Sequence, residues 1–217
     1  MPQRQLQTDS QGISTARITE AVKRNVSPAP GLRWLDVGCG YGDLVRWILA
    51  EQQPESVSAV DILPWLPDDL IEAVDYRVGP AEEQLRGMMP VDRLLMIETL
   101  EHVEAPWALL RMAAGLLRPG GLLIITTPNI FGARSRLDMA LRSQLTAFRT
   151  DYVGHLTPVL PHAAVHVLED AGLHATTSFT AIDMMPASRK DRPWPGWVAS
   201  RWPRLTSASL LVVGEKP

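Results

Sequence analysis

Short apolar runs alternate with amphipathic stretches along most of the chain. Apolar runs predict buried strands at 32–37, 57–60, 91–97 and 122–126, and shorter or mixed runs predict strands at 75–78, 175–180 and 208–213. Apolar spacing of three and four predicts helices that begin near Asp43, span 68–73, begin at Pro106 and span 161–171. This alternation is typical of an α/β protein built on a parallel sheet.

The N-terminal region has a different pattern. Residues 1–11 are polar, whereas residues 13–26 fit an amphipathic helix in which Ile18, Val22 and Val26 recur every four positions. Two prolines at 28 and 30 end this helix. We expect a tail and helix over residues 1–30, the helix either covering a ligand or packing on the domain edge, and one domain over residues 31–217.

The most informative stretch is the turn after the first strand, where Gly38, Gly40 and Gly42 lie between Asp36 and Asp43. Glycine at every second position requires a tightly curled backbone that another group approaches closely. The dinucleotide fingerprint is G-x-G-x-x-G, with a pyrophosphate at the helix N-terminus. Here the spacing is G-x-G-x-G, and the two carboxylates would repel a pyrophosphate. They favour a cationic ligand such as S-adenosylmethionine (SAM), which carries an ammonium and a sulfonium.

A third acid, Asp61, closes the second strand. An acid at this position can accept hydrogen bonds from both hydroxyls of a ribose. NAD-dependent enzymes place an acid similarly, so Asp61 indicates an adenosine ribose without identifying the cofactor. Asp36 then favours SAM over NAD.

Together these features resemble the class I SAM-dependent methyltransferases, over about residues 32–173. The segments that carry the resemblance are Asp36–Gly42, Asp61, Glu98–Val103 (E-T-L-E-H-V), Leu117–Gly121 (L-R-P-G-G), Thr127–Asn129 (T-P-N) and Ala171–Gly172. The resemblance implies a Rossmann-like, doubly wound, seven-stranded, mostly parallel sheet of order 3-2-1-4-5-7-6, with strand 7 antiparallel. It implies SAM as the cofactor, with the binding residues Asp36, Gly38, Cys39, Gly40, Gly42, Asp61, Ile62, Ala81, Glu82 and Glu98.

One loop departs from the family pattern. Related enzymes often carry G-D-A after the third strand, with the Asp accepting the adenine amino group, whereas this chain has Gly79-Pro80-Ala81. Either Glu82 or a backbone carbonyl makes that contact, or apolar contacts such as Ile62 hold the adenine.

Two histidines are candidates for the catalytic base. Methyl transfer from SAM is an in-line displacement of an excellent leaving group, so the protein mainly positions the acceptor and excludes water. A hydroxyl acceptor also needs a base, and histidine is the usual one. His102 follows the fourth strand, and His155 lies where the family often has a histidine near the site. The alternative for each is a structural, hydrogen-bonded histidine.

A metal site competes with this interpretation. Glu98, Glu101 and His102 stand at i, i+3 and i+4, and with His155 they offer two carboxylates and two imidazoles to a divalent cation. The small-RNA 3′-terminal 2′-O-methyltransferases look similar, with E-x-x-E-H, T-P-N and a distant histidine. L-E-H-V also occurs in metal-free relatives, so we expect no metal and keep this set as the alternative.

Two segments are expected to lie outside the common scaffold. Residues 130–156 follow the fifth strand and have helical spacing, and in related enzymes such an insertion covers the active site and helps to choose the substrate. Its arginines are Arg134, Arg136, Arg142 and Arg149. Residues 192–203 predict a stiff loop rich in Trp and Pro, which walls an apolar substrate, touches a membrane surface, forms a dimer contact or packs back on the domain edge.

The composition of the chain narrows the range of functions to be considered. A net charge of −3 and a pI near 6.0 argue against a general nucleic-acid binder. The single cysteine, Cys39, excludes an intrachain disulfide, and we find no signal peptide or 18-residue apolar run. We expect a soluble, cytoplasmic monomer or homodimer without a nucleic-acid partner.

The expected function is therefore SAM-dependent methyl transfer to a small-molecule, glycan or lipid-linked acceptor, on oxygen. Two alternatives stay open. One is a metal-assisted RNA 3′-terminal 2′-O-methyltransferase. The other is a non-catalytic SAM-binding partner protein, which would be consistent with Pro80 in place of the Asp that contacts adenine in related enzymes.

Overall fold

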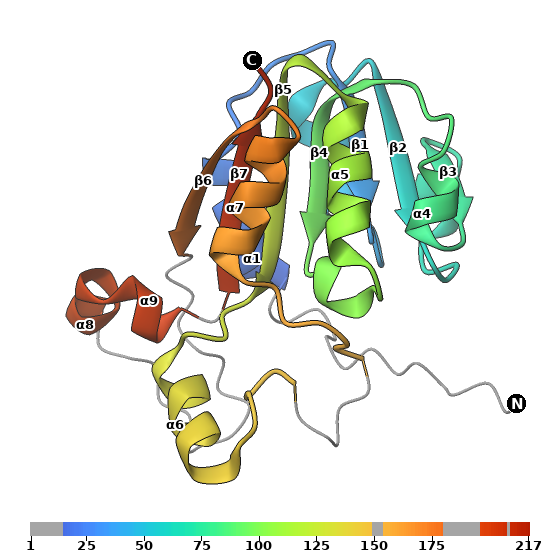
Figure 1. Cartoon of the computed structure of the whole chain (residues 1–217). Helices are drawn as coiled ribbons and strands as arrows, with labels where there is room; N and C mark the ends of the chain where they lie inside the picture. Colours follow the sequence, from blue (N-terminus) through green and yellow to red (C-terminus); the bar gives the residue numbers. More distant parts are fainter. Residues whose placement is uncertain (1–14, 149–153, 180–195, 208) are drawn as a thin grey trace, which may run out of the picture.

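A central sheet organises the computed structural model, which describes residues 15–148, 154–179, 196–207 and 209–217 (Figure 1). Within those residues the sheet has seven strands, in the order β3-β2-β1-β4-β5-β7-β6. They are β1 (Arg33–Val37), β2 (Ser56–Asp61), β3 (Asp75–Val78), β4 (Val91–Ile97), β5 (Leu117–Pro128), β6 (His174–Phe179) and β7 (Ser209–Glu215). Strands β1 to β5 pair in parallel, and β7 runs antiparallel to β5 and β6. The predicted fold class and strand order are confirmed.

Helices cover both faces of the sheet (Figure 1). The helical elements are α1 (Thr15–Arg24), α2 (Asp43–Trp47), the π-helix η1 (Ile48–Gln52), α3 (Asp68–Ile71), α4 (Ala81–Gln84), the 3-10 turn η2 (Leu100–His102), α5 (Pro106–Leu116), α6 (Ala133–Arg142), α7 (Pro161–Asp170), α8 (Gly196–Arg201) and α9 (Pro203–Thr206). Side chains of a strand alternate between faces. Leu35 of β1 therefore joins the core beneath α5 and α7, and Trp34 joins the core beneath α1 and α2.

The N-terminal helix packs on the sheet. Ile18, Val22 and Val26 are buried in the same core as Trp34 and Trp47. The structure thus shows the packing alternative for this helix. Residues 1–14 of the predicted tail and helix lie outside the described residues.

Two predicted elements differ in the structure. Strand β5 begins at Leu117 rather than Leu122, because Leu117 pairs with Val91 and the Gly120 amide donates to the Lys216 carbonyl at 2.7 Å. The predicted aromatic loop is wrong for residues 196–203, because α8 occupies residues 196–201 and α9 begins at Pro203. Pro203 occupies the first turn of α9, where its missing amide proton costs nothing. Residues 149–153, 192–195 and 208 lie outside the described residues.

Candidate active site

The carboxyl ends of parallel strands β1, β2, β4 and β5 meet at one edge of the sheet. Ligands of open α/β sheets bind beyond this edge. The glycine turn follows β1, Asp61 ends β2, and η2 follows β4, so the predicted cofactor and catalytic residues converge on the same edge.

The three glycines of the turn all have left-handed backbones, but they face different neighbours. Their φ angles are 79°, 51° and 79° at Gly38, Gly40 and Gly42. A Cβ at Gly38 would lie 2.3 Å from the Thr99 Oγ1, and one at Gly42 would lie 2.5 Å from the side chain of Leu70. A Cβ at Gly40 would meet nothing within 4 Å. The chain itself approaches the first and third glycines, which leaves Gly40 as the open position for a ligand.

Asp61 braces this turn from the neighbouring strand. Its Oδ2 accepts a hydrogen bond from the Gly40 amide at 2.8 Å, and its Oδ1 accepts one from the Leu63 amide at 3.1 Å. Each carboxylate oxygen has a second lone pair. The same side chain can therefore position the turn and accept hydrogen bonds from a ribose.

Asp36 lies beneath the turn and is almost completely buried, with 1% of its surface exposed. Its Oδ2 has no hydrogen-bond partner among the described residues. Burial, and to a lesser extent the charge of Asp61, raise the pKa of Asp36 to about 7. A buried carboxylate with one oxygen left without a hydrogen bond fits a ligand that brings a positive charge, and SAM carries an ammonium. The residues present therefore fit this cofactor.

The other expected cofactor residues surround the same edge. Ile62 is 58% exposed directly after Asp61, Ala81 and Glu82 begin α4, and Cys39 is buried within the turn. Burial raises the pKa of the Cys39 thiol far above its usual range, so this thiol stays protonated. Cys39 thus contributes packing and its backbone rather than a reactive thiolate.

Glu98 has an unusual backbone conformation. Its φ of 50° lies in the left-handed region that residues with a side chain seldom adopt. The Glu98 amide donates to the Thr126 carbonyl at 3.0 Å, which holds this conformation at the end of β4. Burial raises the pKa of its carboxyl group. Such strain persists only where surrounding contacts enforce it, and it occurs often at functional sites.

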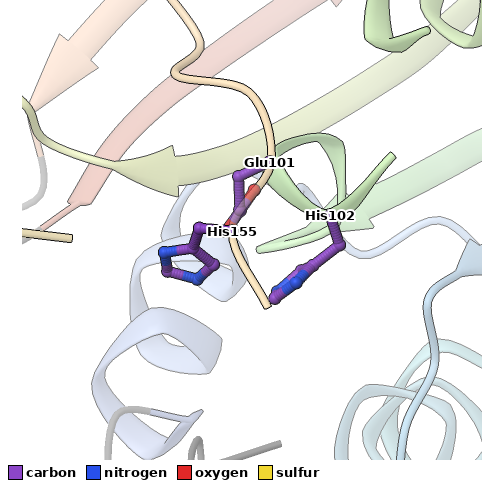
Figure 2. A group of neighbouring side chains, drawn as sticks. All are labelled: Glu101, His102 and His155. Atoms are coloured by element: carbon purple, nitrogen blue, oxygen red, sulfur yellow. The ribbon is translucent and has the colours of Figure 1, made fainter. Parts of the chain in front are cut away.

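Glu101, His102 and His155 form a cluster at η2, the 3-10 turn that follows β4 (Figure 2). One ligand atom from each of the three lies within 4.8 Å of the others. Glu101 is fully buried, and neither of its carboxylate oxygens has a hydrogen-bonding partner among the described residues. Burial and the charge of Glu98 raise the pKa of Glu101 well above its usual value. Three members of the alternative metal set thus come together, and Glu98, the fourth, is not part of this cluster.

Backbone carbonyls fix both imidazoles. The Nδ1 of His102 lies 2.8 Å from the Gly154 carbonyl oxygen, and the Nδ1 of His155 lies 2.6 Å from the Ala147 carbonyl oxygen. A carbonyl can only accept, so each Nδ1 carries the proton and each neutral ring has its lone pair on Nε2. Burial lowers the pKa of both histidines, which keeps them neutral at neutral pH. Each ring is therefore prepared to take a proton or to bind a metal ion.

Hydrogen bonds of Asp138 support the position of His155. Asp138 of α6 accepts a hydrogen bond from the Thr146 hydroxyl at 2.7 Å and one from the Arg142 guanidinium at 2.9 Å. These contacts hold the segment that presents the Ala147 carbonyl to His155. Sequence reasoning missed this network, because nothing in the spacing of Asp138 and Thr146 links them to a histidine.

The backbone of η2 holds the two residues that follow His155. The amides of Leu156 and Thr157 donate to the Glu101 carbonyl at 2.7 and 3.1 Å. The backbone of Glu101 thus fixes the chain that carries His155, while the Glu101 side chain enters the cluster.

Comparisons with known proteins agree with this geometry. Residues 8–178 match a family described as a methyltransferase domain. The chain is 39% identical over 198 residues to a ubiquinone biosynthesis O-methyltransferase of Xanthomonas campestris pv. campestris (strain B100), covering 87% of this chain and 77% of the relative. It is 33% identical over 210 residues to the protein of the same name in Xanthomonas axonopodis pv. citri (strain 306), covering 91% and 81%.

Solved structures share the fold at low sequence identity. A SAM-dependent methyltransferase from Archaeoglobus fulgidus superposes with a TM-score of 0.63 at 17% identity, covering 94% of both chains. The N-methyltransferase NodS from Bradyrhizobium japonicum WM9, solved with S-adenosyl-L-homocysteine, gives a TM-score of 0.60 at 14% identity, covering 96% of this chain and 90% of NodS. The family match, the two relatives and the turn with its buried acids lead to one conclusion: the chain belongs to the methyltransferase-domain family and is a SAM-dependent methyltransferase.

Proposed function

We propose that this methyltransferase acts on an oxygen atom of a small-molecule, glycan or lipid-linked acceptor. The observation that carries the proposal is the pair of neutral imidazoles at the carboxyl edge of the sheet, each with its Nδ1 proton bonded to a backbone carbonyl. An amine acceptor that binds in its neutral form needs no such base, whereas a hydroxyl must lose its proton. The relatives' names, O-methyltransferases of ubiquinone biosynthesis, support oxygen as the acceptor atom.

Residues of the turn would hold the cofactor. SAM, when bound, supplies a methyl group on a sulfonium that leaves readily. The carboxylate of Asp36 would compensate the ammonium, Asp61 would accept hydrogen bonds from the ribose, and the exposed Ile62 would contact the adenine. Gly38, Cys39, Gly40 and Gly42 would shape the backbone around the ligand, with Ala81, Glu82 and Glu98 at its margins.

His155 is proposed as the general base, with His102 beside it. The Nε2 lone pair of His155 would accept the proton of the acceptor hydroxyl. The Ala147 carbonyl would then stabilise the imidazolium, because it already accepts the Nδ1 proton. Both rings are partly buried, which would limit water at the site and favour transfer to the acceptor.

A panel of acceptors tests the proposal. Purified protein is incubated with isotopically labelled SAM and hydroxyl, amine and thiol acceptors, and each product is located by mass spectrometry. The proposal expects labelled O-methyl products that depend on His155. Exclusive N- or S-methylation would contradict it.

A second candidate is metal-assisted transfer, including transfer to the terminal 2′-hydroxyl of an RNA. The cluster of Glu101, His102 and His155 favours it, because an unpartnered buried carboxylate beside two Nε2 lone pairs resembles a divalent-cation site. Elemental analysis and activity after chelation separate the two candidates. Loss of activity on chelation, with recovery on adding Mn²⁺ or Mg²⁺, would favour the metal. The non-catalytic alternative is not retained, because the family assignment indicates an enzyme.

A further inference from the structure

The side chain of Asn129 joins two segments that are far apart in the sequence. Asn129 directly follows β5 and is buried. Its Nδ2 donates to the Arg204 carbonyl at 3.0 Å and to the Ser207 carbonyl at 2.9 Å. Its Oδ1 accepts a hydrogen bond from the Phe131 amide at 3.0 Å. Because these partners require two donors and one acceptor, they fix the orientation of the amide group.

The two donors of Asn129 close the end of α9. The last carbonyls of a helix have no partner within the helix and need one from elsewhere. Arg204 lies in α9, and Ser207 is the residue that follows it, so the amide group serves two carbonyls of the same helix end. An aspartate here would bring no donor, and a glutamine would be longer by one methylene. The position therefore requires the size and the chemistry of an asparagine.

The acceptor of Asn129 fixes the start of α6. A side-chain oxygen that accepts from the amide two residues later forms an Asx turn, as Asn129 does with Phe131. The Phe131 carbonyl accepts in turn from the Nε of Arg136 at 2.9 Å. A Cβ at Gly132, the N-cap of α6, would lie 3.6 Å from the Leu205 carbonyl oxygen. The entry to α6 thus packs against the end of α9, and the two helices lie close together (Figure 1).

Helix α6 connects this junction to the candidate base. Asp138 of α6 accepts from the Thr146 hydroxyl at 2.7 Å, and the neighbouring Ala147 carbonyl lies 2.6 Å from the Nδ1 of His155. A continuous series of contacts therefore leads from Asn129 through α6 to His155.

We propose that Asn129 is a positioning residue for methyl transfer. It fixes α6 against α9, and through α6 it sets the place of the carbonyl that orients His155. The residues proposed to hold SAM follow other strands, β1 and β2, so Asn129 acts on the acceptor side of the site. The part that concerns His155 rests on the proposed function, whereas the joining of α6 and α9 does not.

Hydrogen exchange of the full-length chain, followed by mass spectrometry, tests the junction. Asn129→Ala removes all three hydrogen bonds and should speed exchange about tenfold or more in both segments 131–148 and 203–207, while peptides from β1 and β2 stay unchanged. Asn129→Ser keeps a short acceptor for the Phe131 amide, so it should speed exchange less. Asn25→Ala is the matched control, because it removes an asparagine bond to the Ala21 carbonyl in α1 and should leave both segments unchanged.

Kinetics test the effect on His155. Asn129→Ala should lower kcat by about tenfold and leave the Kd for SAM unchanged. In the background of His155→Ala the same change should have almost no further effect on kcat. A general loss of the fold would weaken SAM binding as well and would act equally in both backgrounds.

Three results would overturn the proposal. They are unchanged exchange of either segment in Asn129→Ala, a loss of SAM affinity that accompanies the loss of kcat, and additive effects of Asn129→Ala and His155→Ala. Full activity of His155→Ala would refute the proposed base and the catalytic part of this proposal. Faster exchange in both segments would still establish that Asn129 joins α6 to α9, so the two failures are distinguishable.

Discussion

The imidazole rings of His102 and His155 pack edge to face with their centroids 4.8 Å apart, although α5, β5 and α6 separate them in the sequence. A backbone carbonyl fixes each of them, so the fold of the chain sets the tautomer. The two rings and the buried Glu101 side chain therefore lie in one cluster.

Replacing His155 separates catalysis from cofactor binding. His155→Ala should lower kcat by about 10²- to 10⁴-fold, the usual contribution of a general base, and leave the Kd for SAM unchanged. Because burial lowers the pKa of His155, the wild-type kcat at saturating SAM should be flat above pH 6.5 and should fall only at lower pH. Steady-state kinetics and calorimetry measure these quantities. His162→Ala, on the exposed start of α7, is the control, and full activity of His155→Ala would remove it from the mechanism.

Asp138 should act through His155. Asp138→Ala removes the acceptor of the Thr146 hydroxyl and should lower kcat by about tenfold, because the Ala147 carbonyl loses its support. In the background of His155→Ala the same change should have almost no further effect on kcat. A double-mutant cycle measures this coupling. Additive effects would show that Asp138 has only a structural role.

Asp36 should make both stability and SAM affinity depend on pH. Its pKa is about 7 in the fold and near 3.8 in an unfolded chain, so the folded state binds more protons between these values. Stability without SAM should therefore fall as the pH rises from about 4 to 7. Asp36→Asn should be more stable than the wild type at pH 8, by about 1–4 kcal/mol, and equal to it at pH 4.

The ionisation of Asp36 also predicts how the affinity for SAM depends on pH. An ammonium stabilises the ionised form of Asp36, so SAM affinity should rise with pH and level off above about 7, and Asp36→Asn should lose this dependence. Titration calorimetry at several pH values measures it. An affinity independent of pH in the wild type would contradict the role of Asp36.

Two glycines of the turn should respond differently to the same change. Gly38→Ala places a Cβ 2.3 Å from the Thr99 Oγ1 at a φ of 79°, and should destabilise the protein by about 2–4 kcal/mol. Gly40→Ala meets open space and should cost about 1–2 kcal/mol of backbone strain while weakening SAM binding. Urea unfolding and calorimetry compare the pair. Equal stability of the two variants would refute the assigned contacts.

Asp61 should contribute to cofactor affinity through hydrogen bonds. Asp61→Ala should weaken SAM binding by about 1.5–3 kcal/mol, the scale of lost charge-assisted bonds. Part of this loss would come from the Gly40 and Leu63 amides, which lose their acceptor. Asp69→Ala, which breaks an exposed pair with Arg46 and leaves Asp61 intact, is the control. Unchanged affinity for SAM would exclude the ribose role.

The local pattern of apolar and polar residues was sufficient to predict the scaffold. The strands at 75–78 and 91–97 have the predicted bounds, and α2 begins at Asp43 as expected, because burial and glycine turns leave a mark within a few residues. The start of β5 and the helices α8 and α9 were not predictable in this way. The start of β5 depends on Val91 and Lys216, and α9 contacts Asn129 and α6, all of them far away in the sequence.

The sequence by itself determined the fold class and SAM as the cofactor, and it supplied the candidate bases, since each depends on residue type and spacing. Only the tertiary structure decided that Thr99 fills the space at Gly38, and that the Ala147 and Gly154 carbonyls fix the two imidazoles. Backbone carbonyls belong to every residue and carry no signature in the sequence. Which carbonyl meets which ring is set by long-range packing, so it appears only when the chain is folded.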